Sequence, residues 1–351
     1  MITLYLTSMG EAAGKSALCA ALGKIFKADG RKVGFLEPVA IVAEKPDSSD
    51  KDAEFMKLTL ALEEPVELLC PNYISTSDLA ATANEKEPAW LNRAKEALDA
   101  VSHGKDVVLL EGVSGFKAGS GPAIAGSRIV ETLGARAILI VRYESGLQVS
   151  QVMDAAKMLG AHLLGVIINA VPQRRMDSVK ATMVPALERS GFKVLGVLPE
   201  DRLLLTVSVG EMVEHLGGNI LNSPERSEEL VESIMVGAMS PDPAVSYLSL
   251  RPRKVVVTRG DRPDIQMAAL ETLTNCLVLT NNISPLPNIL TRAKSLKMPI
   301  AVVKGDTVHT LEELERVWEK AKFSHERKVE KLEQLLEQHL DLASIRQAAQ
   351  A

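Results

Sequence analysis

The first 200 residues alternate short apolar runs with longer stretches of helical periodicity. The runs consist almost entirely of Val, Ile and Leu and show no alternation of polar and apolar positions, which is typical of strands buried on both faces of a sheet. They are Ile2–Leu6, Val33–Leu36, Val107–Leu110, Ala137–Val141, Leu164–Ile168 and Val194–Leu198. Helical patterns between them, such as Ser16–Ala28 and Gln148–Leu159, predict parallel strands joined by right-handed crossovers. The pattern therefore predicts an α/β domain with a parallel sheet over residues 1–200.

A second, smaller α/β unit is predicted over residues 201–310, where shorter strands and helices alternate. The strands are Lys254–Thr258, Cys276–Thr280 and Ile300–Val303, and the helices are Val209–Leu216, Asp264–Leu273 and Asn288–Ser295. Residues 311–351 are charged and helical, and they carry an apolar stripe of Val329, Leu332, Leu336, Leu340 and Ala343. Such a stripe predicts a helical tail that packs on its own domain or on a second copy of the chain, and we expect a homo-oligomer.

Composition narrows the class of protein. The 351 residues are 46% hydrophobic and carry a net charge of −5, which excludes a disordered chain and a broadly basic nucleic-acid surface. Only 3% of the residues are aromatic, so stacking platforms for single strands are not expected either. The three cysteines form no CxxC pair and suit a reducing cytoplasm. No signal peptide and no membrane-spanning run is found, so we expect a cytoplasmic protein.

The strongest chemical signal follows the first predicted strand and opens the first predicted helix. It is the segment Ser8-Met9-Gly10-Glu11-Ala12-Ala13-Gly14-Lys15-Ser16. Small residues let backbone N–H groups converge on phosphate oxygens, and the helix N-terminus favours an anion. The GxxxxGK[ST] pattern expects glycine at position 9, where this chain has Met9, with Gly10 offset by one. The alternative is an ordinary strand–helix turn that binds nothing.

Two carboxylates are candidates for a Mg²⁺ site beside the Ser16 hydroxyl. Glu111 ends an apolar strand and would face the crevice at the carboxyl edge of the sheet. Asp52 is the second candidate, with Asp50 a near rival. The alternative for Asp52 is an N-cap of a helix starting near Ala53.

These motifs, taken in order, resemble dethiobiotin synthetase and its relatives over residues 1–200. Within that group the chain is most similar to the amino-terminal portion of long phosphate acetyltransferases, and residues 203–310 resemble the DRTGG domain that follows it there. The supporting segments in the first part are the loop ending in Gly14-Lys15-Ser16, Phe35–Val39, Asp52-Ala53, Glu111-Gly112 and Leu164–Asn169. In the second part they are Ser208–Glu211, Val236–Ser240 and Thr258–Ile265.

The resemblance implies an ATP and Mg²⁺ site. The phosphates would be held by Gly10, Gly14, Lys15 and Ser16, and Mg²⁺ by Ser16, Asp52 and Glu111. Asn169 matches the residue that reads the adenine edge, and Pro199 and Glu200 match the loop that packs on the base. An amide suits that role because it offers a donor and an acceptor together. Lys15 and Glu37 are the candidate catalytic residues.

One position departs from the resemblance. Dethiobiotin synthetases carry Lys-Pro after the second strand, whereas this chain has Glu37-Pro38, which reverses the charge that would stabilise a carbamate. The acyl-transfer domain of long phosphate acetyltransferases is also not found in these 351 residues, so that activity is not expected of this polypeptide.

Three functions remain open. The first is a regulatory or sensor protein that binds ATP and Mg²⁺ in its first domain, while the DRTGG domain binds a second, unidentified effector or mediates assembly. The loop containing Arg259, Asp261, Arg262 and Asp264 could hold an anionic effector, or could be an internal salt-bridge cluster. The second is an ATP-dependent ligase or carboxylase acting on a small amine or acid, and the third is an interaction module whose loop binds nothing.

Overall fold

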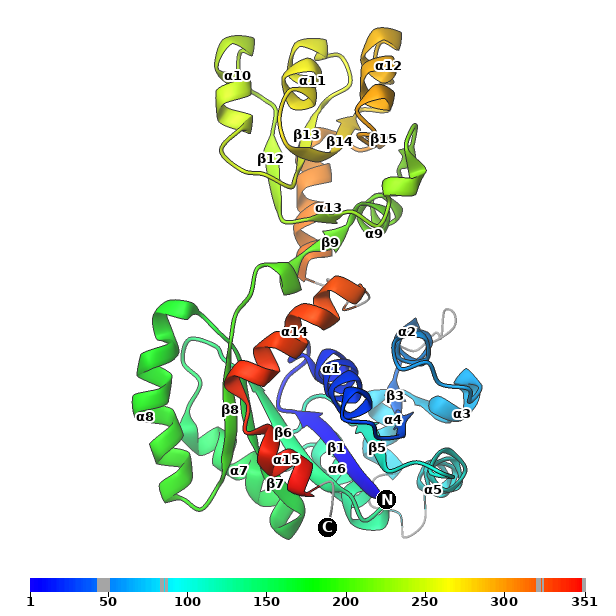
Figure 1. The fold of residues 1–351 in the computed structure, drawn as a ribbon, viewed down its shortest axis with the longest axis vertical. Helices are drawn as coiled ribbons and strands as arrows, with labels where there is room; N and C mark the ends of the chain where they lie inside the picture. Colours follow the sequence, from blue (N-terminus) through cyan, green and yellow to red (C-terminus); the bar gives the residue numbers. More distant parts are fainter. Residues whose placement is uncertain (43–50, 83–84, 86–87, 320–322, 324, 349–351) are drawn as a thin grey trace. The chain divides into compact units, whose positions relative to one another are not determined.

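The computed structural model describes the chain except residues 43–50, 83–84, 86–87, 320–322, 324 and 349–351 (Figure 1). The described chain divides into two compact units. Unit 1 comprises Met1–Asp201 and Phe323–Ala351, and unit 2 comprises Arg202–Lys322. The last helices of the chain are thus divided between the units: the one that begins at Thr307 belongs to unit 2, and those that follow it belong to unit 1.

Unit 1 is built on a parallel sheet with the strand order β2-β5-β1-β6-β7-β8. The strands are β1 (Ile2–Ser8), β2 (Val33–Leu36), β5 (Val107–Glu111), β6 (Arg136–Arg142), β7 (Leu163–Val171) and β8 (Val194–Pro199). Every residue of β2 and β5 is buried, as the absence of alternation predicts. The α/β fold class predicted for this part of the chain is confirmed.

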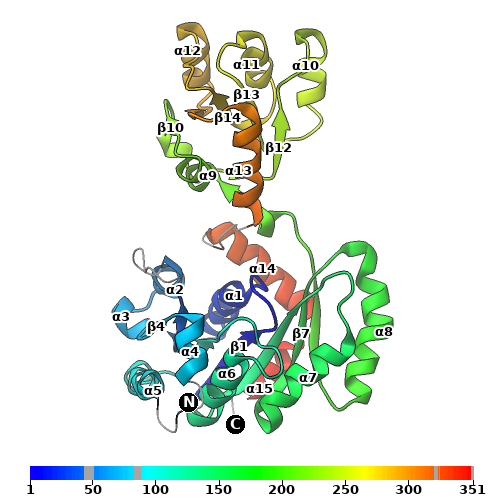
Figure 2. The ribbon, with the colours of Figure 1, turned by 180° about the vertical axis from the view of Figure 1, so that it is seen from behind.

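Helices cover both faces of this sheet (Figures 1 and 2). The helix that follows β1, α1 (Lys15–Ala28), lies on one face together with α14 (Glu326–His339). The opposite face carries α6 (Gly121–Thr132) and α7 (Val149–Leu159), with α8 (Met176–Arg189) at the β8 edge. The other elements of unit 1 are β3 (Ala40–Ile41), α2 (Lys51–Thr59), α3 (Val66–Leu69), β4 (Tyr73–Ile74), α4 (Thr76–Thr82), α5 (Ala89–Val101) and α15 (Leu342–Ala348).

The apolar stripe near the end of the chain packs inside unit 1, against α1. Val329, Leu332 and Leu336 are buried on α14 as expected. Ala343 is exposed instead, because the backbone turns extended at Leu340 and the helical phase starts again in α15. Leu342 and Ile345 are the buried residues of that helix.

Gly196 permits the close approach of this segment to β8. A Cβ at Gly196 would lie 2.3 Å from the His339 carbonyl oxygen, which is closer than real Cβ atoms come. The Asp341 amide donates to the Leu195 carbonyl at 2.7 Å, so the chain after α14 is hydrogen-bonded to the edge of the sheet. The end of α14 is therefore fixed to β8 by backbone contacts that a side chain at position 196 would obstruct.

Unit 2 has a five-stranded sheet of order β10-β15-β14-β13-β12, in which only β10 is antiparallel to its neighbour among the described strands. The strands are β10 (Asn219–Ile220), β12 (Ser233–Val236), β13 (Lys254–Arg259), β14 (Thr274–Thr280) and β15 (Ile300–Val302). A separate short pair joins β9 (Val207–Ser208) to β11 (Leu230–Val231). The predicted second α/β region is thus present. It also contains β12 and the helix that follows it, which the sequence pattern did not predict.

Alternate residues of the central strands face two different hydrophobic cores. Val256, Leu277 and Leu279 pack with α10 (Pro241–Leu248), α11 (Pro263–Leu270) and α12 (Pro287–Ser295). Val255 and Val257 pack on the other side with α9 (Val209–His215) and α13 (Thr307–Glu319). No helix in the described ranges is long and apolar enough to cross a membrane.

Candidate functional site

The loop from Met9 to Gly14 joins β1 to α1 at the carboxyl edge of the unit 1 sheet. Met9, where the standard pattern has glycine, donates its backbone N–H to the Ile140 carbonyl of β6 at 3.2 Å. The offset Gly10 has open space where a Cβ would stand, and the Ser8 hydroxyl donates to its carbonyl at 2.7 Å. Neither position has positive φ, so the start of the loop does not depend on glycine.

The second half of the loop contains two left-handed residues, which is a feature of anion-binding nests. Ala12 and Gly14 are left-handed, with φ of 49° and 92°, and the residue between them is not. Alternation of this kind turns successive backbone N–H groups toward one point, where an anion can be bound. Because Gly14 is also the residue before α1, the nest leads directly into the helix N-terminus.

Two polar side chains hold this conformation from the adjacent strands β6 and β7. Arg142 ends β6 and is paired with Asn169, which lies two residues before the end of β7. The Arg142 guanidinium donates to the Ala12 carbonyl, and the Asn169 amide donates to the Ala13 carbonyl, both at 2.8 Å. These two hydrogen bonds fix consecutive carbonyls of the loop. The Asn169 side chain also accepts from the amide of Ala170, which is left-handed as well, with φ of 56°.

The first residues of α1 meet the carboxyl end of β5. The Ser16 hydroxyl donates to Glu111 Oε1 at 2.5 Å, and Glu111 is 5% exposed. The Lys15 ammonium donates to the Ser114 hydroxyl in the loop that follows β5. The Ser16 hydroxyl of the loop motif and the Glu111 carboxylate of a later strand are therefore adjacent. Hydroxyl and carboxylate oxygens are both possible ligands of Mg²⁺.

Glu37 lies near the same charged groups. It follows β2, is half-buried, and donates its backbone N–H to the Leu69 carbonyl at 2.7 Å. Burial raises the pKa of the Cys19 thiol well above its usual range, the Glu111 and Glu37 carboxylates contribute to the increase, and the Lys15 ammonium opposes it. Three charged side chains, at the start of α1 and at the carboxyl ends of β2 and β5, thus influence the pKa of one buried thiol of α1. The Cys19 thiol itself is kept protonated and unreactive.

The remaining predicted residues lie on α2, at the end of β8 and directly after it, or outside the described region. Asp52 is an exposed residue in the first turn of α2, which begins at Lys51, so it is not the residue before the helix. Its near rival Asp50 lies outside the described residues. Pro199 ends β8 half-buried, and the exposed Glu200 donates its amide to the Val171 carbonyl at 2.8 Å.

Sequence reasoning missed two residues of this arrangement, Arg142 and Ser114. For each of them, its position in the sequence could have indicated its place in the site. Arg142 directly follows the apolar run Ala137–Val141 and therefore ends a strand at the same edge as Glu111. Ser114 lies between Gly112 and Gly115, in the loop that leaves that edge.

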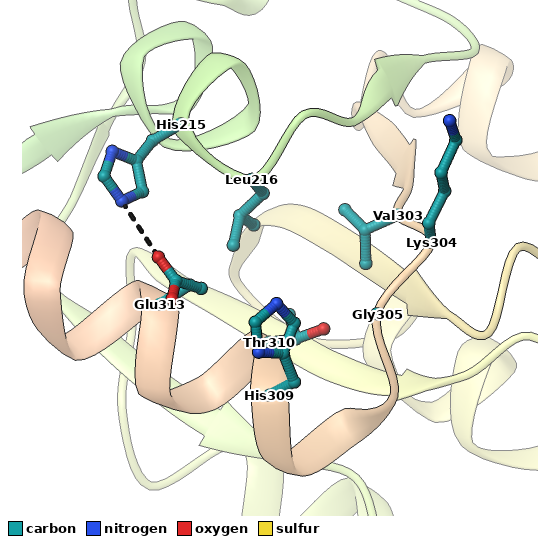
Figure 3. A pocket seen from close by; sticks show the side chains of 8 residues that line it. All are labelled: His215, Leu216, Val303, Lys304, Gly305, His309, Thr310 and Glu313. Atoms are coloured by element: carbon teal, nitrogen blue, oxygen red, sulfur yellow. Dashed lines mark ion pairs between the residues drawn. The ribbon is translucent and has the colours of Figure 1, made fainter.

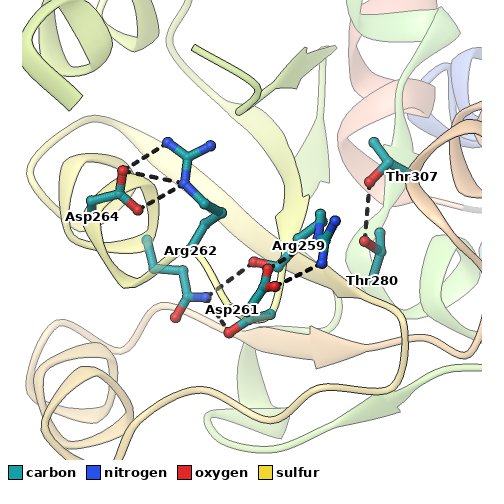
Figure 4. A network of polar contacts seen from close by, with 8 residues as sticks. Arg259, Asp261, Arg262, Asp264, Thr280 and Thr307 are labelled. Carbon is teal, nitrogen blue, oxygen red and sulfur yellow. Dashed lines mark hydrogen bonds and ion pairs between the residues drawn. The ribbon is translucent and has the colours of Figure 1, made fainter. Parts of the chain in front are cut away.

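In unit 2, the charged loop after β13 is an internal salt-bridge cluster (Figure 4). Arg259 contacts both carboxylate oxygens of Asp261, at 3.0 and 2.7 Å. Arg262 makes a similar two-fold contact with Asp264, at 2.9 and 2.7 Å, and donates to the Met239 carbonyl. These contacts agree with the second of the two alternatives for the loop, because each arginine is paired with a neighbouring aspartate.

Unit 2 also contains a pocket of about 470 Å³ between α9 and the start of α13 (Figure 3). Leu216 and Val303 form its apolar part, and His215, His309 and Lys304 are among its polar residues. The His215 imidazole lies 3.3 Å from a Glu313 oxygen, so part of the polar lining is already paired. Among the residues that the structure describes, no group of three His, Cys, Asp or Glu side chains could hold a metal ion.

A parallel sheet whose first strand leads through an anion-binding nest into a helix, beside Lys15, Ser16 and Glu111, defines a P-loop NTPase domain. Comparison with known families agrees. The family model described as an AAA domain matches residues 2–207, so the chain belongs to that family, and the DRTGG domain model matches residues 211–317.

Curated relatives support the same organisation. The phosphate acetyltransferase of Nitrosomonas europaea is 25% identical over 361 aligned residues, which cover 97% of this chain and 50% of that protein. The ATP-dependent dethiobiotin synthetase of Methanococcus vannielii is 22% identical and covers 57% of this chain and 94% of its own length. The chain thus spans about half the length of the phosphate acetyltransferase and is related to its amino-terminal region.

Solved structures are more distant. The cobyrinic acid a,c-diamide synthase of Mycobacterium smegmatis, solved with bound ADP and magnesium, is 13% identical. The match covers 57% of this chain and 88% of that one, with a TM-score of 0.38. A similarity this low supports no inference about what this chain binds.

Proposed function

We propose that unit 1 binds ATP with Mg²⁺ and that the protein has a regulatory or sensor role. The observation that carries the proposal is the left-handed geometry of Ala12 and Gly14, which forms a nest directly before α1. In a chain with net charge −5, the Lys15 ammonium beside this nest donates to a serine hydroxyl and forms no ion pair with a described residue. Backbone N–H groups and one available cation are the groups that a polyphosphate requires.

The residues at the edge of β5 fit Mg²⁺. Ser16 and Glu111 would hold the ion, with Asp52 as the candidate third ligand, and Mg²⁺ would supply positive charge beside the β- and γ-phosphates. The 2.5 Å contact between the Ser16 hydroxyl and Glu111 supports this assignment, because the two oxygens that would bind the ion are already adjacent.

The base would lie at the carboxyl ends of β7 and β8, near Asn169, Pro199 and Glu200. The Asn169 amide uses one N–H for Ala13 and one lone pair for Ala170. A second N–H and a second lone pair remain, which is enough for one donor and one acceptor contact with an adenine edge.

An ATP-dependent ligase or carboxylase is the second candidate function. The position of Glu37, within electrostatic reach of the same buried thiol as Lys15 and Glu111, favours it. A carboxylate at that point would attract an amine or a second cation and repel a carbamate. The acceptor substrate would then be a small amine or acid held between Glu37 and the γ-phosphate. A regulatory protein, by contrast, needs no acceptor there.

Calorimetric titration with ATP, ADP and a non-hydrolysable ATP analogue, each with and without Mg²⁺, tests the first proposal. We expect Mg²⁺-dependent ATP binding that Lys15→Ala weakens at least tenfold. Lys24→Ala is the matched control, because Lys24 lies on the same helix but pairs with the exposed Glu326. Equal binding by Lys15→Ala and wild type would show that the loop assignment is wrong. ATP hydrolysis that depends on an added diamine or small acid would favour the ligase.

A further inference from the structure

Arg142 contacts the loop but is explained neither by the motif pattern nor by the proposed catalytic roles. It ends β6 half-buried, and its Nη1 lies 2.8 Å from the Ala12 carbonyl. In the part of the chain that the structure describes, Arg142 forms no ion pair. Its positive charge is therefore retained beside the phosphate loop, as is that of Lys15.

The contact with Ala12 has a conformational consequence. A left-handed alanine is strained relative to its usual conformations, and persists only where its surroundings fix it. The hydrogen bond from Arg142 fixes the carbonyl of this strained residue. A guanidinium has five N–H donors and this contact uses one of them, so further donors remain for other oxygens.

Arg136, at the opposite end of the same strand, shows what an ordinary surface arginine does here. Its guanidinium donates to the Ala161 carbonyl at 3.3 Å, far along the strand from the loop. Ala161 is not among the left-handed residues. The strained partner and the position at the carboxyl edge therefore distinguish Arg142 from a residue that merely caps a turn.

We propose that Arg142 is a positioning residue of the nucleotide site, which holds Ala12 in the anion-binding conformation and adds a second positive charge for the phosphates. This inference rests on the proposed function of unit 1. Its ligand class is a nucleoside polyphosphate rather than a monophosphate, because two separate cations suit an extended row of anionic groups. The nest and Lys15 form the primary contacts, and Arg142 acts on them through Ala12.

The test compares Arg142→Gln and Arg142→Lys with the control Arg136→Gln in the full-length protein. ATP affinity is measured by calorimetry at about 0.05 M and about 0.5 M salt, since screening weakens a charge effect but not a purely steric one. Hydrogen exchange of the loop amides of residues 10–16 is measured in the nucleotide-free protein, where no ligand contributes to the result.

We expect Arg142→Gln to weaken ATP binding about 10- to 100-fold at low salt, the usual range for loss of a charge-assisted hydrogen bond. The loss should be smaller at high salt, Arg142→Lys should recover part of it, and Arg136→Gln should bind as wild type does. Loop amides should exchange faster in Arg142→Gln than in either wild type or the control.

Two results would overturn this inference without overturning the proposed function of unit 1. One is wild-type affinity in Arg142→Gln while Lys15→Ala still loses binding. The other is a loss that is the same at both salt concentrations, not restored by lysine, with unchanged loop exchange. If wild-type protein binds no ATP, the proposed function fails and this inference fails with it, which is a distinguishable outcome.

Discussion

Gly14 is the residue of the loop whose replacement should have the largest effect on folding. Its φ of 92° is disfavoured for any residue with a Cβ, and a Cβ built there would lie 2.7 Å from Asn169 Nδ2. The amide cannot move freely, because it is hydrogen-bonded to the Ala13 carbonyl and to the Ala170 N–H. Gly14→Ala therefore combines backbone strain with a contact against a fixed group.

The two contributions can be separated with Gly134→Ala. Gly134 is also left-handed, with φ of 61°, but has open space around the added Cβ. We expect Gly134→Ala to cost about 1 kcal/mol, the value for a left-handed alanine. Gly14→Ala should cost about 2–4 kcal/mol, because displacing Asn169 also breaks one or two hydrogen bonds worth about 1 kcal/mol each.

Urea unfolding monitored by tryptophan fluorescence measures this difference. The chain has two tryptophans, Trp90 in unit 1 and Trp318 in unit 2, so a Trp318→Phe background leaves Trp90, which is 3% exposed, as a reporter of unit 1. In a double-mutant cycle, Asn169→Ala should remove most of the extra cost of Gly14→Ala. Equal free energies of unfolding for the Gly14 and Gly134 variants would refute the reasoning, since the close contact would then cost nothing.

Three further predictions follow from other contacts. Gly196→Ala should detach the end of α14 from β8, because its Cβ would lie 2.3 Å from the His339 carbonyl, and limited proteolysis after residue 323 should then be faster than in wild type. Burial lowers the pKa of the Lys254 ammonium to about 8. Unit 2 should therefore gain stability as pH rises from about 8 toward the pKa of about 10.5 in the unfolded chain. Urea unfolding at pH 7.5 and pH 10 should show this gain in wild type and not in Lys254→Met. Glu111→Gln keeps an acceptor for Ser16 but removes the charge, so calorimetry should show ATP binding that no longer depends on Mg²⁺, and an unchanged Mg²⁺ dependence would exclude Glu111 as a ligand.

The sheet of unit 1 could be predicted because parallel strands buried on both faces produce uninterrupted apolar runs. Each of the six runs is a strand in the structure. Helix α10 of unit 2 was missed because Pro241 and Pro243 break the pattern at the helix start, where proline is in fact tolerated. The strand before it, β12, was missed as well, and it has only four residues. Ala343 was predicted to lie on the stripe because one continuous helix was assumed to run through Leu340. Leu340 is extended instead, and the periodicity of apolar residues does not reveal the backbone conformation of a single residue.

The side chains of the candidate site were partly predictable for a related reason. Lys15, Ser16 and Glu111 could be placed together because each follows the carboxyl end of a parallel strand, and those ends share one edge. Arg142 follows the same rule but was not recognised, since a basic residue after an apolar run also occurs at any solvent-exposed strand end. The pairing of Arg262 with Asp264 depends on side-chain rotamers, so spacing alone left two alternatives open.

The departure at Met9 shows which parts of the phosphate-loop pattern are physically required in this chain. Met9 and Gly10 have ordinary φ, and Met9 extends the backbone pairing to β6, so a side chain at position 9 creates no strain. The left-handed positions are Ala12 and Gly14. Gly14 matches the pattern, and the strain at Ala12 is offset by the hydrogen bond from Arg142. A loop of this kind can therefore keep the anion-binding conformation without its first glycine, provided that neighbouring strand ends hold its carbonyls.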